Sequence, residues 1–205
     1  MAKPFTALHD DVLPYLPGAP VPLVDSAIRK ATREFLRRTT VLRQEFTFTA
    51  TPGIDTYRLN PASGQVSSVL AVYADGVDRP LPVATEYARY ASAVTQTSWQ
   101  SPTPNVLRIL PVPTEEQTFR VEAVITLGFE DNSFPDEIFE NYSDALALGT
   151  LSVMYAMPGK PWTSAESAKS SGRGFGNEIR RVRSLLRDGG QPNASTLTAT
   201  FKFGR

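Results

Sequence analysis

Residues 119–129, FRVEAVITLGF, constrain the fold of this chain more than any other segment. Every second residue is apolar: Phe119, Val121, Ala123, Ile125, Leu127 and Phe129. Successive side chains of a β-strand point to opposite faces, so this pattern predicts a strand with one face buried in a core. Such a strand needs neighbours, and we therefore expect an antiparallel sheet in the middle of the chain.

Other segments between residues 42 and 129 have the alternation or the turn residues of strands. The segment QEFTFTAT, at 44–51, is followed by a TPG turn and by IDTYRL, at 54–59, which predicts a hairpin. A further strand is expected to end at the Asp75-Gly76 turn and to continue into a short return strand. The segment NVLRILPVP, at 105–113, is predicted to pair with 119–129 across the TEEQ turn.

Helical periodicity is found on both sides of this region. Residues 22–40 predict a helix whose apolar face consists of Val24, Ala27, Ile28, Ala31 and Phe35. A second helix is predicted to extend to about residue 157, and a third to run from about residue 163 to residue 188. The second helix carries a stripe of small residues, where another helix can approach closely: Ala145, Gly149, Ser152 and Ala156.

These segments together predict an α+β fold. Residues 1–41 and 131–188 are expected to form a helical layer or bundle, residues 42–130 an inserted antiparallel β domain, and residues 189–205 an extended tail. The chain has 205 residues, of which 41% are hydrophobic, so it can bury a substantial core.

The composition narrows the classes of function. The formal net charge is zero, which argues against a free-standing protein that binds nucleic acid through an overall positive field. Cysteine is absent, which excludes thiol catalysis and metals held by cysteine. His9 is the only histidine, so a Ser-His-Asp triad is disfavoured. We expect no catalytic set, no cofactor and no metal. We also expect a soluble chain without a membrane partner, because the longest nearly apolar run, 145–157, is too short to span a bilayer.

Two basic strips are the main candidates for contacts with other molecules. The first strip lies on the helix predicted for residues 22–40 and contains Arg29, Lys30, Arg33 and Arg37. The second lies on the last helix and contains Arg173, Arg180, Arg181, Arg183 and Arg187. Three interpretations remain open for these strips: a solvated helix face, contact with an acidic partner subunit, and contact with DNA phosphate.

An acidic segment could supply the subunit contact. Its carboxylates are Glu130, Asp131, Asp136 and Glu137. They lack the glycine and the ligand spacing of an EF-hand, so a cation site is not predicted. We expect Asp131, Asp136 and Glu137, together with Arg29, Arg33 and Arg37, to take part in a subunit interface.

Three glycines at alternate positions, Gly172, Gly174 and Gly176, precede most of the second strip. A dinucleotide-binding loop needs the spacing GxGxxG and a strand directly before it, and both are absent from this sequence, so a nucleotide site is not predicted. Each interior glycine costs about 1 kcal/mol of helix stability relative to alanine. We therefore expect a pliable or kinked point in the last helix.

The tail contains an isolated alternating segment. Gly189-Gly190 ends the last helix, and the apolar face that follows consists of Leu197, Ala199, Phe201 and Phe203. A lone amphipathic strand exposes apolar side chains and an unpaired edge. It is expected to pair either with the chain's own sheet or, preferably, with a sheet edge of another chain.

The order of these segments resembles that of head-to-tail adaptor proteins of tailed phages, of the podophage type. The resemblance is carried by VLPYLPGAPVPLVDSAIRKATREFLRRTTVLRQEF at 12–46, by LRILPVPTE at 107–115, and by FPDEIFENYSDALALGTLSVMYAMPGKPWTSAESA at 134–168. In the last of these, a proline-acid helix start, a small-residue stretch and the Pro161-Trp162 break follow one another. The triple glycine departs from the family's pattern.

The resemblance implies a structural protein of the virion, made in the host cytoplasm. Such adaptors form a homo-oligomeric ring, a dodecamer, between the portal protein and the tail nozzle or tail tube. They extend the channel through which double-stranded DNA passes without base recognition. Their C-terminal tails clasp the portal or a neighbouring adaptor, and the glycines would then act as a hinge that fits the helix to a ring.

Alternative functions remain open at this point. A tail-completion or terminator ring of different symmetry would have the same location in a virion. A glycan-binding β module of a tail fibre would need an exposed aromatic surface, for which Trp99, Tyr87 and Tyr90 are the candidates. An enzyme is disfavoured by the single histidine and the absence of cysteine.

Overall fold

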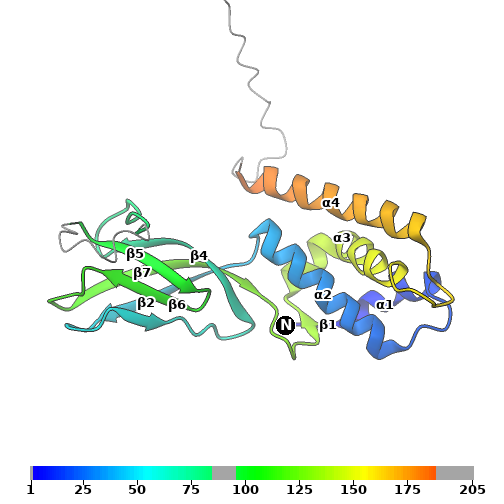
Figure 1. Cartoon of the computed structure of the whole chain (residues 1–205), viewed down its shortest axis with the longest axis horizontal. Helices are drawn as coiled ribbons and strands as arrows, with labels where there is room; N and C mark the ends of the chain where they lie inside the picture. The colour runs from blue at the N-terminus through cyan, green and yellow to red at the C-terminus, as the bar shows by residue number, and fades with distance from the viewer. Residues whose placement is uncertain (1, 85–95, 188–205) are drawn as a thin grey trace, which may run out of the picture.

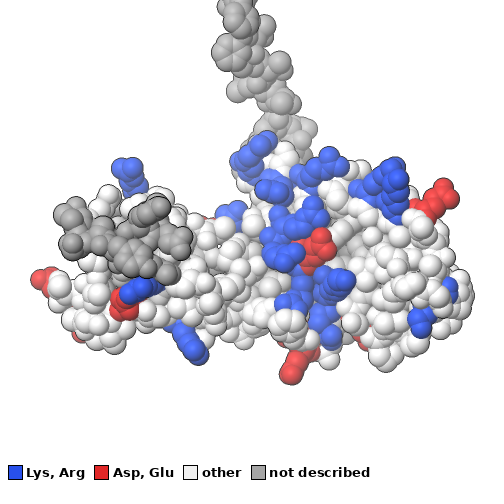
Figure 2. Space-filling view, viewed as in Figure 1, with Lys and Arg blue, Asp and Glu red and all other residues white. Residues whose placement is uncertain are grey.

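The computed structural model describes residues 2–84 and 96–187, and it confirms the α+β class. The chain forms a helical part and a β part that lie end to end (Figure 1). Figure 2 shows the two parts joined in one elongated body. The junction is a set of direct contacts, in which the Ile125 amide donates to the Leu42 carbonyl at 2.9 Å and the Thr126 hydroxyl donates to the Arg33 carbonyl at 3.4 Å.

The helical part combines both ends of the described chain. Its elements are β1 (Lys3–Pro4), η1 (Phe5–Leu8), α1 (His9–Val12), η2 (Leu13–Tyr15), α2 (Val21–Thr39), β8 (Ser133–Phe134), α3 (Asp136–Tyr155) and α4 (Ala165–Arg187). The short strands β1 and β8 pair antiparallel and tie the N-terminal segment to the start of α3. Helix α2 ends where Thr40 adopts a left-handed backbone with φ 58°, and its amide donates to the Leu36 carbonyl.

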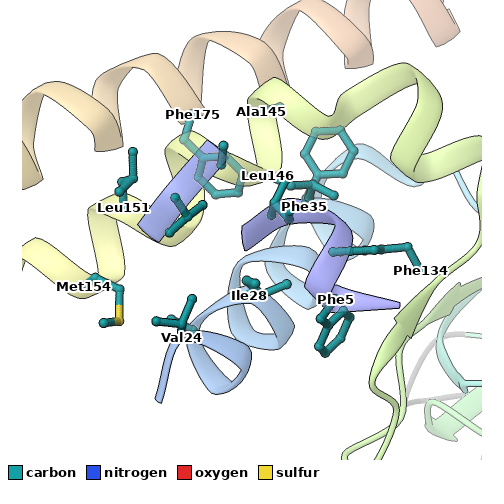
Figure 3. Packing of buried hydrophobic residues seen from close by; sticks show 14 of the residues in the cluster. Phe5, Val24, Ile28, Phe35, Phe134, Ala145, Leu146, Leu151, Met154 and Phe175 are labelled. Carbon is teal, nitrogen blue, oxygen red and sulfur yellow. The ribbon is translucent and has the colours of Figure 1, made fainter. Parts of the chain in front are cut away.

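One apolar core holds α2, α3 and α4 together. The periodic residues of α2 are buried as predicted: Val24, Ala27, Ile28, Ala31 and Phe35. Phe35 is fully buried, and its ring lies 5.1 Å from that of Tyr142 on α3 and 6.3 Å from that of Phe175 on α4. Figure 3 shows Phe35, Leu146 and Phe175 between these helices.

The small residues of α3 and α4 serve close packing. A Cβ atom added at Gly149 would lie 2.9 Å from the Phe175 ring and 3.1 Å from the Ala31 side chain. On α4, a Cβ at Gly172 would lie 3.0 Å from the Ser152 hydroxyl, and one at Gly174 would lie 3.1 Å from Leu148. Helix α4 is continuous from Ala165 to Arg187. The predicted kink at the glycines is therefore wrong, because two of them permit the approach of α3 and do not interrupt the helix.

The glycines permit a matched test of this packing. We expect Gly149→Ala to lower the free energy of unfolding by about 1–3 kcal/mol, because the added methyl group overfills the contact with Phe175. Gly176→Ala should raise it by up to about 1 kcal/mol, because the new methyl group meets no atom within 4 Å and alanine favours a helix. Urea unfolding of both variants measures the difference, and equal effects of the same sign would contradict this account.

In the described residues, the β part is a sandwich of two three-stranded antiparallel sheets. Its strands are β2 (Arg43–Ala50), β3 (Thr56–Arg58), β4 (Gln65–Ala74), β5 (Ser98–Thr103), β6 (Val106–Leu110) and β7 (Gln117–Thr126). The strand orders are β2-β7-β4 and β3-β6-β5. Apolar residues of both sheets form one shared core: Ala50, Leu59, Val66, Val72, Trp99, Leu107, Ile109, Phe119, Val121, Ala123 and Ile125.

The strand pairings differ from those expected. β2 does not form a hairpin with β3, and β6 does not pair with β7; instead β7 lies between β2 and β4, and β6 lies between β3 and β5. The reason is that the chain crosses between the sheets at both places, so Phe48 of β2 contacts Tyr57 of β3 through the core, with ring centroids 4.6 Å apart. The return strand after Asp75-Gly76 is also not formed, although the Leu81 amide donates to the Val72 carbonyl at 2.7 Å.

An ion pair fixes the loop before β3 to the second sheet. The Arg108 guanidinium donates to the Asp55 carboxylate at 2.5 Å, and the Ile109 amide donates to the Asp55 carbonyl at 2.8 Å. The hydrogen bond from the Thr56 hydroxyl, followed by that from Arg108, lowers the pKa of Asp55 below its usual value. Asp55 is half-buried, and its contacts with Arg108 and Ile109 hold the start of β3 against β6.

Candidate interaction surface

A basic groove follows the outer side of α2. This α2 groove is an open cleft of about 660 Å³ between α2 and the edge of the β part. Its basic residues are Arg29, Lys30, Arg33 and Arg37, and the start of β4, Pro104 and Phe129 form the opposite wall. The structure thus brings the whole first basic strip together. Figure 2 shows Lys and Arg side chains gathered over this part of the molecule.

Two arginines of the α2 groove are held in place by their own chain. The Arg33 guanidinium lies 3.8 Å from the centroid of the Phe129 ring, in a cation–π contact. Arg29 donates to the Asp131 carbonyl at 2.6 Å. Phe129 is 72% exposed, so it does not join the buried face of β7 as expected. The strand ends at Thr126, and the chain then turns Phe129 towards the groove.

A second basic groove lies where the C-terminal ends of α2 and α4 meet. This α4 groove has a volume of about 540 Å³ and carries four arginines with the hydroxyl groups of neighbouring residues. Its polar lining consists of Thr39, Thr40, Arg43, Arg180, Arg183, Ser184 and Arg187. Three residues of the second basic strip therefore meet here, whereas Arg173 and Arg181 lie outside the groove on exposed turns of α4.

The arginines of the α4 groove differ in their local partners. Arg43 forms an ion pair with Glu122 at 2.8 Å, and Arg180 donates to the Asn177 side chain at 2.5 Å. Outside the groove, Arg181 pairs with Glu178 at 2.8 Å. Arg183 forms no ion pair with any residue that the structure describes. Arg43 was not predicted as a site residue, because it is the first residue of a strand and belongs to no basic run in the sequence.

The expected acidic partners are partly used within the chain. The Asp131 carboxylate accepts from the Gly128 amide at 2.6 Å and thereby shapes the loop after β7. Asp136 and Glu137 begin α3, where the positive end of the helix dipole stabilises carboxylates. A different acidic set on α3 is more exposed: Glu137 and Glu140 precede the kink of this helix at Tyr142, and Asp144 follows it. We call these three residues the α3 acidic stripe, and only Glu137 was predicted.

Other candidates from the sequence are not assembled into a surface. Trp99 is buried in the sandwich core, where its indole nitrogen donates to the Leu81 carbonyl at 3.1 Å, so it cannot form an aromatic surface for a sugar or a base. Its two proposed companions, Tyr87 and Tyr90, lie outside the described residues. The apolar residues of the proposed docking tail also lie outside them: Leu197, Ala199, Phe201 and Phe203.

Within residues 2–84 and 96–187, no three His, Asp or Glu side chains are grouped so that they could hold a metal ion. In the same ranges, no helix has the length and the apolar character that a membrane span requires.

Comparison with known proteins does not assign the chain to a family. No family model matches the sequence, and no curated protein matches it either.

Proposed function

We propose that this chain is a structural subunit of a virion, a head-to-tail adaptor that forms a ring between the portal and the tail nozzle or tube. The observation that carries the proposal is the separation of charge on a chain of zero net charge. Two arginine-lined grooves and an exposed acidic stripe occupy different elements of the helical part. A subunit that meets copies of itself and a polyanion needs such separated surfaces.

The α4 groove is the part that we assign to DNA. Arginines and hydroxyl groups are the side chains that contact phosphate, and none of the residues lining the groove is acidic. A channel has to let the genome slide, so contact with phosphate alone suits it better than recognition of bases. In this assignment Arg180, Arg183 and Arg187 face the channel with Arg43, and Arg173 and Arg181 are peripheral.

The sandwich and the tail complete the proposal. The resemblance to adaptors implies that the chain end docks on the portal or on a neighbouring subunit, and this part stays a prediction. The edge strands of the two sheets, β2 and β4 in one and β3 and β5 in the other, are places where an extended segment can add by backbone hydrogen bonds.

Electron microscopy of the purified protein, with and without the portal protein encoded in the same genome, tests the proposed function. We expect a monomer or weak oligomer alone and a closed ring of twelve copies on the portal. Exposed ion pairs contribute only about 0–1 kcal/mol each, so assembly should need the portal as a template and should weaken with salt. The mass of the portal-bound assembly separates an adaptor from a terminator ring of other symmetry. Failure to bind the portal would contradict the proposal, and a salt-resistant ring without portal would contradict its template dependence.

A further inference from the structure

The α3 acidic stripe and the α2 groove have opposite charges that are not neutralised within the chain. Glu140 and Asp144 are exposed, and they form no ion pair with any residue that the structure describes. The same holds for Lys30 and Arg37 in the groove. Both sets of charges are therefore exposed and available to a partner.

We propose that the α3 acidic stripe of one copy docks in the α2 groove of a second copy. The inference rests on the proposed ring and names the surfaces that would build it. Glu34 is the only acidic residue that lines the groove, and it forms an ion pair at 3.1 Å with Arg38 of the same helix. The remaining field of the groove is therefore positive, which suits a helix that carries three carboxylates.

The composition of the α2 groove favours a protein partner over a nucleic acid. Exposed Phe129 stacks on Arg33, and an aromatic ring beside a fixed arginine is typical of the centre of a protein interface. Arg29 is also fixed, through the Asp131 carbonyl, so two of the four basic groups need no ordering when a partner arrives. The exposed charges of Lys30 and Arg37 then remain for the carboxylates of the partner.

The two surfaces face away from their shared contact. Helix α2 meets α3 through buried residues such as Ala31 and Phe35, which lie on the side of α2 opposite Lys30 and Arg37. The first turns of α3 bury Ile138, whereas Glu140 and Asp144 are exposed. Two different surfaces meet in each contact, so the association is head-to-tail and can repeat around a ring.

Exchange of charge between the surfaces tests the pairing. The groove variant is Lys30→Glu with Arg37→Glu, and the stripe variant is Glu140→Lys with Asp144→Lys; both leave Arg29, Arg33 and Phe129 intact. Sedimentation at high protein concentration and low salt should show weak, salt-sensitive self-association of the unchanged protein. Each variant alone should associate about 100-fold more weakly or not at all, because like charges then meet.

Two recombinations should restore association. An equimolar mixture of the groove and stripe variants, and a single chain that carries all four substitutions, both bring opposite charges together again. The four-fold variant has the net charge of the original chain, so its recovery cannot come from a change in total charge. A control with Arg58→Glu and Arg79→Glu, two exposed arginines of the β part, should associate as the unchanged protein does.

The outcomes separate this inference from the proposed function. Circular dichroism first shows whether each variant is folded. The pairing would be overturned by an unchanged protein that does not self-associate even at high protein concentration and low salt, by a variant that associates normally, or by recombinations that fail to restore association. If the unchanged protein binds the portal and these variants also form rings, the adaptor function is supported and the proposed pairing of surfaces is wrong. If the recombinations restore association but the protein does not bind the portal, the pairing of surfaces is supported and the adaptor function is wrong.

Discussion

A Phe35→Ala variant is expected to lose about 3–5 kcal/mol of its free energy of unfolding. Phe35 is fully buried where α2, α3 and α4 meet, and its ring contacts those of Tyr142 and Phe175 (Figure 3). Alanine leaves a cavity that these neighbours cannot fill without moving the helices. Urea unfolding followed by circular dichroism measures the loss, which should appear in the transition of the helical part.

Phe129→Ala is the matched control for this prediction, because it removes the same atoms from an exposed position. Phe129 is 72% exposed and contacts Arg33 through one face of its ring. A cation–π contact at an exposed site contributes about 0.5–1 kcal/mol, so the variant should remain within about 1 kcal/mol of the unchanged protein. Equal losses in the two variants would show that Phe35 is not at the centre of the helical core.

The helices could be predicted because local periodicity determines their buried faces. The apolar face of residues 22–40 is buried as a set, and the helix ends within one residue of the expected positions. Strand β7 was predicted for the same reason, although Phe129 falls beyond its end. In each case the information lies within a few neighbouring residues.

The strand pairings could not be predicted from the same kind of information. Alternation shows that Leu107 and Ile109 are buried, but it does not say whether they lie beside Phe119 and Val121 or opposite them. A short loop favours a hairpin, and here two short loops cross the core between sheets. The choice depends on how the sandwich as a whole fills its core, as the contact between Phe48 and Tyr57 illustrates.

The site was predictable to the same degree as the helices that carry it. The spacing of Arg29, Arg33 and Arg37 placed them on one face, and they line one groove. By contrast, Arg43 joins the α4 groove only because β2 starts beside the end of α4, a neighbourhood that no local pattern encodes. The glycines of α4 were interpreted as a hinge because their packing partners, Leu148 and Ser152, are on another helix.

Removal of Arg180 and Arg183 should sharply weaken the binding of duplex DNA. If the α4 groove contacts phosphate, the plot of log affinity against log salt should lose about 0.9 in slope for each contact removed, or about 1.8 for Arg180→Ala with Arg183→Ala. The affinity at low salt should fall about 10- to 100-fold, and equally for duplexes of unrelated sequence, because phosphate contacts do not read bases. Fluorescence anisotropy with two labelled duplexes measures both quantities.

Two control pairs decide whether this effect belongs to the α4 groove. Arg58→Ala with Arg79→Ala removes the same charge from the β part and should leave the salt slope unchanged. Lys30→Ala with Arg37→Ala removes it from the α2 groove, which we assign to a second copy, and should change the slope little. Basic residues near the end of a helix also stabilise that helix through its dipole. If Arg180→Ala with Arg183→Ala lowers the melting temperature but leaves the salt slope intact, the arginines of α4 stabilise their own helix, and the groove does not face DNA.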